Sequence, residues 1–151
     1  MERAEKLYKA VGLLLDVCKE IQDKARESLL EKTEYVGFAK EYCTIKLGGA
    51  RGSGHTTLIN LLLQRKFPKS LVLFYNLKMM QLYKRHYDKG NKKSIFLSIG
   101  SDLGKLAGHR GFDAIIIDCA SIIPKTKMDN IYKILATEER LEKEFYFILL
   151  E

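Results

Sequence analysis

Apolar positions recur every three or four residues at the start of the chain, with charged residues between them. They form one stripe within residues 1–30, which consists of Ala4, Leu7, Val11, Leu14, Cys18, Ile21, Ala25 and Leu29. This spacing predicts a single long amphipathic helix. Such a helix can cover its own domain, and the heptad-like spacing also suits contact with another chain.

From residue 42 onward, short apolar runs alternate with stretches of helical pattern. We expect strands at 42–47, 70–75, 94–99, 112–118 and 144–150, and helices at 56–63, 77–87, 102–107 and 129–136. Strands that alternate with helices and are apolar on both faces are typical of a parallel sheet covered on two sides. The predicted fold class is therefore α/β. Residues 1–41 form a helical segment, and residues 42–151 form a three-layer α/β/α domain with a mostly parallel five-stranded sheet.

A glycine-rich segment joins the first expected strand to the helix that follows it. Residues 49–56 read GARGSGHT, which has the spacing G-x-x-x-x-G-K-[ST] of a phosphate-binding loop, with His55 in the place of lysine. Glycines let successive N–H groups turn toward phosphate oxygens, and the start of a helix adds partial positive charge. Thr56 would then place its hydroxyl on a Mg²⁺ ion that bridges two phosphates.

An aspartate ends the fourth expected strand, about 60 residues after the glycines. Residues 115–118 read IIID, an apolar run that stops at Asp118. In phosphate-loop NTPases an aspartate in this context holds Mg²⁺, usually through water. A strand that ends in aspartate is common, but together with the loop it indicates a nucleotide site.

The two motifs resemble a known family. Residues 46–57, KLGGARGSGHTT, resemble the loop of P-loop NTPases, in particular the ATPase domain of viral large terminases (DNA-packaging motors) and related helicases. Residues 106–118, LAGHRGFDAIIID, are similar to a further terminase segment, so that the resemblance covers about residues 43–123. It implies binding of ATP and Mg²⁺, a cytoplasmic location (host cytoplasm if the protein is viral), and a place in a larger viral assembly.

The resemblance also assigns roles to individual residues. Thr56 and Asp118 would hold the metal, and the catalytic candidates are Asp118 and Arg51, which would act as an arginine finger in cis. The residues implied to bind the triphosphate are Gly49, Arg51, Gly52, Ser53, Gly54, His55, Thr56 and Thr57.

Two departures make both Walker motifs degenerate. His55 replaces the lysine whose ammonium bridges phosphates, and a neutral imidazole supplies little charge near pH 7. Cys119 stands where the family has the glutamate that polarises the attacking water, and a thiol is a poor general base. We therefore expect weak or absent hydrolysis, with phosphate binding retained. The alternative is a non-hydrolysing binding or regulatory subunit that assembles through its N-terminal helix, and a small nucleotide or nucleoside kinase is a third reading.

The net charge of +7 is concentrated in one segment. Residues 62–93 contain nine basic residues and one acidic residue. Clustered Lys and Arg favour contact with the phosphate backbone of nucleic acid, and the alternative is a solvated helix face. Tyr75, Tyr83 and Tyr87 could stack on bases, and for Tyr75 we expect packing in the core instead. The nucleic-acid candidates are Lys84, Arg85, Lys89, Lys92 and Lys93.

The rest of the composition excludes other classes. The apolar runs are far shorter than the ~20 residues of a membrane helix, so we expect no membrane partner. The three cysteines show no metal-ligand spacing, which favours a reducing, intracellular setting.

Overall fold

The computed structural model describes residues 2–29, 35–48, 54–87, 93–100, 110–136 and 141–151. The helices are α1 (Glu2–Leu29), α2 (Tyr35–Tyr42), α3 (His55–Arg65), α4 (Leu77–Tyr87) and α5 (Lys125–Leu135), with a 3-10 turn η2 (Ala120–Ile122). The strands are β1 (Thr44–Leu47), β2 (Ser70–Phe74), β3 (Ile95–Ser98), β4 (Phe112–Asp118) and β5 (Leu141–Leu150).

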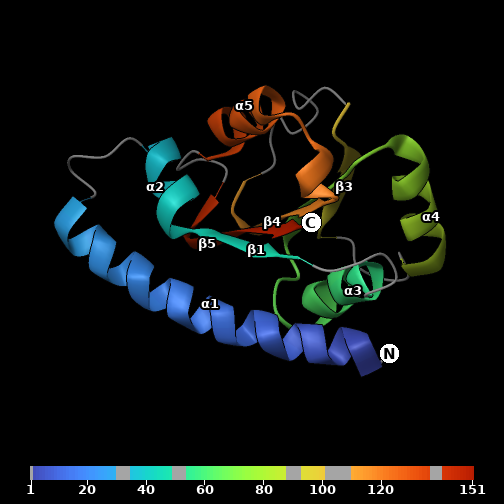
Figure 1. Ribbon diagram of the computed structural model, residues 1–151, viewed down its shortest axis with the longest axis horizontal. Helices are drawn as coiled ribbons and strands as arrows, with labels where there is room; N and C mark the ends of the chain where they lie inside the picture. The colour runs from blue at the N-terminus through green and yellow to red at the C-terminus, as the bar shows by residue number, and fades with distance from the viewer. Residues whose placement is uncertain (1, 30–34, 49–53, 88–92, 101–109, 137–140) are drawn as a thin grey trace.

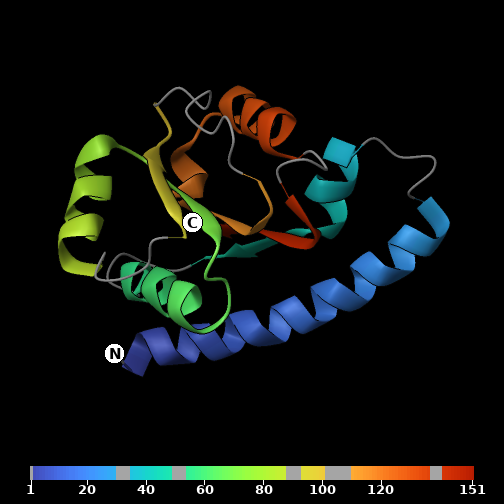
Figure 2. The ribbon, with the colours of Figure 1, turned by 180° about the vertical axis from the view of Figure 1, so that it is seen from behind.

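The strands form a five-stranded sheet in the order β1-β5-β4-β2-β3. All four neighbouring pairs are parallel, which confirms the predicted α/β class with a parallel sheet. Helices α1, α3 and α4 cover one face, and α2 and α5 cover the other (Figures 1 and 2). The arrangement has the three layers expected from alternating strands and helices.

The central strands are apolar on both faces because each face has its own helices. Every residue of β2 is buried, as the run SLVLF predicts. In β4, Ile115 and Ile117 pack with α2 and α5, whereas Ile116 packs with α1 and α3 on the opposite face. Burying both faces of a strand in this way is what a parallel sheet requires.

Helix α1 forms where it was predicted, but its buried face is rotated from the predicted stripe. Leu14 and Ile21, expected inside, are 42% and 45% exposed, while Leu15 and Gln22 are buried in their place. Gln22 can lie inside because its amide donates to the carbonyl oxygen of Phe145 at 2.9 Å, a bond that an apolar pattern does not reveal. The rotation leaves Leu13, Leu14, Val17 and Ile21 on the solvent side of α1.

Several element bounds differ from those predicted. Helix α2 was missed because it has eight residues, includes Gly37, and is too short for a clear period. Helix α5 begins at Lys125 rather than 129, directly after Pro124, which takes the N-cap position. Strand β5 begins at 141 rather than 144. The helix expected at 102–107 lies outside the described residues.

The connections at the carboxyl edge of the sheet go in opposite directions after β1 and β4. The chain leaves β1 toward α3 on one face, and leaves β4 toward η2 and α5 on the other. Strand β5 lies between β1 and β4. Ligands of open parallel sheets bind in the crevice that such a divergence leaves outside the carboxyl ends of the strands.

Candidate functional site

The start of α3 lies directly after the glycine-rich segment. Gly54 takes the N-cap position with φ 97°, and the described residues include no side chain that caps this helix. Its first N–H groups therefore have no partner within the helix or from a capping side chain, which is the arrangement that binds anions at helix N-termini. A Cβ on Gly54 would lie 3.4 Å from the backbone nitrogen of Ala4, so the first turn of α1 supports this position from behind.

Asp118 is the buried acidic residue of the site. It ends β4 with only 5% of its surface exposed, and its Oδ1 accepts a hydrogen bond from the Cys119 N–H at 3.0 Å. Burial raises the pKa of the Asp118 carboxyl, while the Cys119 N–H and the nearby His55 act in the opposite direction. A carboxylate kept from water in this way is one that a bound cation would stabilise.

Cys119 follows Asp118 in a left-handed conformation, with φ 54° and ψ 42°. This conformation costs a residue with a side chain about 1–2 kcal/mol. Backbone strain of this kind is concentrated at functional sites. It marks the turn after β4, where the chain changes direction beside Asp118.

His55 is the first residue of α3 and lies close enough to Asp118 to affect its charge. Its Nε2 is buried and has no hydrogen-bond partner among the described residues. A buried polar atom without a partner costs free energy unless a ligand or water satisfies it. The residue that stands in the place of the loop lysine thus has a buried nitrogen with no partner among the described residues.

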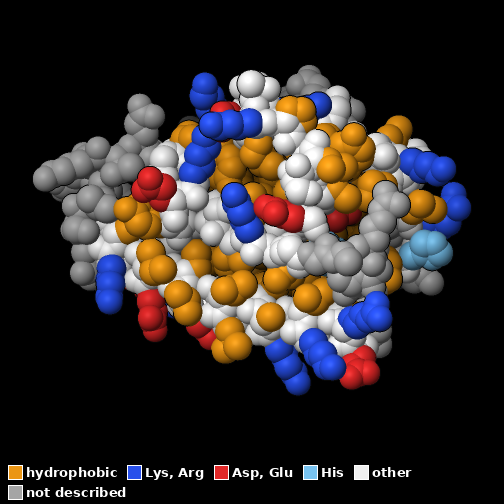
Figure 3. Space-filling model, viewed as in Figure 1, with side chains coloured by type: hydrophobic (Ala, Val, Ile, Leu, Met, Phe, Trp, Pro, Cys, Tyr) orange, Lys and Arg blue, Asp and Glu red, His pale blue; other side chains and the backbone are white. Residues whose placement is uncertain are grey.

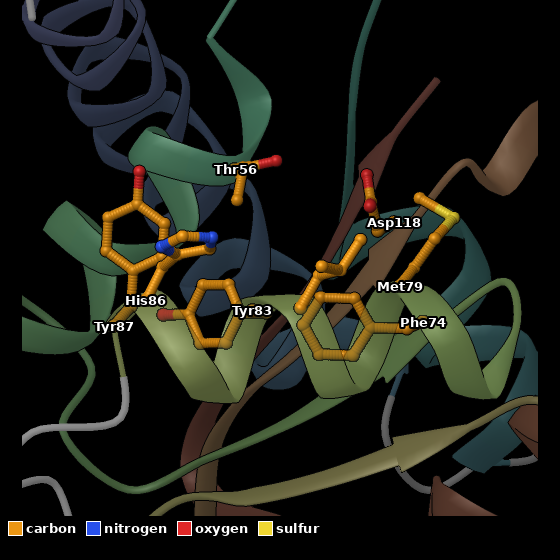
Figure 4. A pocket seen from close by; sticks show the side chains of 8 residues that line it. Thr56, Phe74, Met79, Tyr83, His86, Tyr87 and Asp118 are labelled. Carbon is orange, nitrogen blue, oxygen red and sulfur yellow. The ribbon is translucent and has the colours of Figure 1, made fainter.

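Thr56 and Asp118 line the same cavity, although they come from different elements. Figure 4 shows the Thr56 hydroxyl directed toward the side on which the Asp118 carboxylate lies. A hydroxyl and a carboxylate are oxygen ligands of the kind that Mg²⁺ takes, so these two residues fit the expected metal. Thr57 instead has its hydroxyl 3.2 Å from the hydroxyl of Tyr87, on α4. The other loop candidates, Gly49, Arg51, Gly52 and Ser53, lie outside the described residues.

The cavity has a volume of about 160 Å³ and lies between the start of α3 and helix α4. Phe74, Tyr83 and Asp118 form its buried floor, whereas Thr56, Leu82 and His86 are exposed at its rim. Met79 and Tyr87 are half-buried and complete the wall. Tyr83 and Tyr87 were predicted as residues that could stack on bases, but the sequence did not predict the cavity. The sequence carries little sign of this cavity, because the spacing of apolar residues in α4 is the same for a helix that lines a cavity and for one that packs on the core.

The basic residues of segment 62–93 do not all face solvent in the same way. Lys84 and Arg85 are exposed on α4, and Lys and Arg side chains gather at this edge of the molecule (Figure 3). Lys93 is exposed before β3. Arg65 instead forms a bidentate ion pair with Glu5, with both nitrogen–oxygen distances at 2.9 Å. Lys89 and Lys92 lie outside the described residues. One prediction was wrong: Tyr75 is 39% exposed at the end of β2 rather than in the core, because the strand stops one residue earlier.

No protein-family model matches this sequence, and no curated protein matches it. Among the described helices, none combines the length and the apolar character needed to cross a bilayer. In the same residues, His, Cys, Asp and Glu side chains do not gather in groups of three that could hold a metal ion. A metal at this site would therefore depend on Thr56, Asp118 and the oxygens of its ligand.

Proposed function

We propose that the protein binds ATP with Mg²⁺ at the carboxyl edge of its sheet, as a degenerate P-loop protein of the viral terminase or helicase type. The observation that carries the proposal is the convergence of His55, Thr56 and Asp118. The first two begin α3 after β1, the third ends β4, and they lie where the connections of a parallel sheet diverge.

Each residue has a distinct part in this proposal. The N–H groups of the first turn of α3 bind phosphate oxygens, and Thr56 and Asp118 hold Mg²⁺. The ion, when bound, supplies positive charge to the phosphates. His55 Nε2 gains a partner when an oxygen of the triphosphate reaches it, which removes the cost of leaving it buried and unsatisfied. Arg51 is proposed as the finger in cis.

Weak or absent hydrolysis belongs to the same proposal. Phosphoryl transfer depends on positioned charge, and an imidazole in place of an ammonium supplies less of it. Cys119 is a poor general base toward water. The Asp118 carboxylate accepts a hydrogen bond from the Cys119 N–H and is proposed to bind Mg²⁺. Because it is occupied in this way, it does not activate the attacking water.

A second candidate is a non-hydrolysing subunit of a larger assembly. It is favoured by the apolar solvent side of α1, formed by Leu13, Leu14, Val17 and Ile21. The heptad-like spacing of α1 suits contact with another chain, including a second copy of this one. The proposed location is the cytoplasm, and the proposed partner of the basic segment is nucleic acid.

The two candidates are separated by measuring binding and turnover independently. We expect ATP binding in the wild type and little phosphate release. The double change His55→Lys with Cys119→Glu restores the missing charge and base, so it is expected to raise turnover at least about tenfold, a difference of ~1.4 kcal/mol in the barrier. Thr126→Val, at an exposed position of α5, is the control for effects of substitution that do not involve the site. Turnover that is absent in the wild type and is gained in the double variant would favour the non-hydrolysing subunit. Mg²⁺-dependent turnover by the wild type that Asp118→Ala abolishes would favour the ATPase.

A further inference from the structure

The cavity under α4 extends beyond the residues that a phosphate and a metal require. Only Thr56 and Asp118 of its lining belong to the proposed nucleotide site, and the remaining lining is apolar or aromatic. The six further lining residues are Phe74, Met79, Leu82, Tyr83, His86 and Tyr87. Figure 4 shows the rings of Phe74 and Tyr83 side by side below Thr56 and Asp118, with His86 and Tyr87 at one end. This lining suits a planar aromatic group rather than a chain of phosphates.

The floor is held rigidly by ring contacts. The ring of Tyr83 lies 5.2 Å from that of Phe74, 5.2 Å from that of Tyr87 and 5.3 Å from that of Phe96, between ring centroids. Tyr87 is also fixed by the contact of its hydroxyl with Thr57. A floor built in this way does not need to rearrange when a ring enters, so little ordering entropy opposes binding.

The size of the cavity limits the ligand. Its volume of about 160 Å³ is close to the roughly 150 Å³ of an engineered protein cavity that admits a benzene ring. One six-membered ring fits inside this volume, whereas the second ring of a fused bicyclic group would extend past the open rim. The exposed rim at Thr56, Leu82 and His86 provides the entry.

Basic side chains flank the same rim. Lys78, Leu82 and Arg85 are spaced four and three residues apart on α4, which places them on one face of the helix. Leu82 lines the cavity, and Lys78 and Arg85 lie on the same side of α4 as Leu82 and are both exposed. Lys84 is two residues from Leu82, roughly 200° around the helix, on a different side.

We propose that this cavity binds one pyrimidine nucleotide unit, with its ring against Tyr83 and Phe74 and its phosphate against Lys78 and Arg85. The shared chemistry is a single-ring base linked to a phosphate, from either a free mononucleotide or a single strand of nucleic acid. The inference adds a second ligand to the proposed function and shares only Thr56 and Asp118 with the ATP site. It is tested without ATP or Mg²⁺, so the two can fail separately.

The experiment compares thymidine 5′-monophosphate and adenosine 5′-monophosphate with labelled oligothymidylate and oligoadenylate of about 12 nucleotides, a length within the usual range of single-strand sites. Calorimetry measures the monophosphates, and fluorescence anisotropy measures the strands. The thymine ligands are expected to bind at least about fivefold tighter than the adenine ligands, because the cavity holds a single ring and a purine would extend past its rim. Binding of thymidine 5′-monophosphate identifies the free nucleotide as a ligand, and binding of oligothymidylate alone identifies the strand.

Variants distinguish the cavity from a basic surface. Leu82→Trp fills the mouth and is expected to weaken thymine binding at least about fivefold, by loss of the stacked base. Because the chain has no tryptophan, the emission of this variant reports whether the new ring is buried in the cavity. Met79→Trp fills the cavity from another part of its wall. Affinity is then measured on whichever of the two variants has blue-shifted emission, since that shift shows that its tryptophan is buried.

Lys78→Gln and Arg85→Gln are each expected to weaken binding and to reduce its salt dependence, since each removes one phosphate contact. Lys133→Gln, on α5 at the opposite face of the sheet, is the control.

Three results would overturn the inference. They are binding of neither thymine ligand, equal binding of adenine and thymine ligands, and unchanged affinity when a buried tryptophan fills the cavity. Loss of ATP binding with thymine binding intact would instead remove the proposed function and leave the cavity assignment in place.

Discussion

The carboxyl of Asp118 is buried at the end of β4, within electrostatic reach of His55, the first residue of α3. The two residues are 63 positions apart in the chain, and the parallel sheet brings them together at its carboxyl edge. Asp118 holds a carboxylate away from water, and His55 holds a buried imidazole nitrogen that no group among the described residues satisfies. Both features cost stability in the free protein, and the proposed cation with its phosphates would relieve both.

The burial of Asp118 leads to a prediction about stability. Because burial raises its pKa, the ionised carboxylate opposes folding near pH 7. Asp118→Asn removes the charge and keeps an oxygen for the Cys119 N–H. We expect this variant to unfold at a higher urea concentration than the wild type without ligand. Asp129→Asn, which removes an exposed carboxylate that pairs with Lys40, is the control and is expected to show no such gain. A lower urea midpoint for Asp118→Asn would mean that the charge is already compensated within the fold.

The left-handed conformation of Gly54 predicts a sharp difference between two glycines. Gly54→Ala places a side chain at φ 97° and is expected to cost about 1–2 kcal/mol of unfolding free energy and to weaken phosphate binding, because the start of α3 must shift. Gly48→Ala is the matched control, since a Cβ there meets nothing within 4 Å. Urea denaturation and ATP titration of both variants measure the difference. Equal stability of the two would show that the turn before α3 tolerates a side chain.

The ion pair between Glu5 and Arg65 predicts a pH-dependent anchor for α1. The hydrogen bonds from Arg65 hold the pKa of the Glu5 carboxyl below its usual value. A lowered pKa means that the pair stabilises the fold above the unfolded value, 4.5, and loses this contribution as the pH falls through the folded value. Glu5→Gln is therefore expected to be slightly less stable than the wild type near neutral pH, with the difference vanishing in acid. A difference that persists in acid would assign the effect to packing instead of charge.

The three cysteines are expected to differ in reactivity. Burial raises the pKa of Cys43 above the usual range and that of Cys18 in the same direction, so both thiols resist alkylation in the native protein. Cys119 is half-buried beside Asp118. Iodoacetamide near pH 8 is expected to modify Cys119 first, and ATP with Mg²⁺ is expected to slow that reaction. Mass spectrometry of the digested protein identifies the modified site, and labelling of Cys119 that ignores ATP would argue against a ligand at this edge.

The sequence predicted the layers of the fold well because the strands bury both faces. The runs around Val72 and Ile116 are apolar throughout, which only a sheet covered on two sides requires. It predicted the face of α1 less well, because Gln22 enters the core through its hydrogen bond to Phe145 and rotates the helix away from the purely apolar stripe. Polar residues that are satisfied inside the core are invisible to a hydrophobic pattern.

The sequence likewise predicted one part of the site and not another. Thr56 and Asp118, the two residues that the motifs single out for the metal, line one cavity because both lie at the carboxyl ends of strands of one parallel sheet, and their roles stay a prediction. The cavity was not predictable because it depends on how α4 packs: Tyr83 and Phe74 touch across elements, and Leu82 forms the rim. These contacts are set by tertiary packing and leave no spacing signature.

The most direct test of the account is titration calorimetry with ATP, with and without Mg²⁺, on the wild type, Asp118→Asn and Asp129→Asn. The account predicts that Mg²⁺ tightens ATP binding by the wild type and by Asp129→Asn at least about tenfold, and that Asp118→Asn loses most of this gain while still binding the phosphates. Absence of ATP binding in the wild type, or an equal gain from Mg²⁺ in Asp118→Asn, would contradict it.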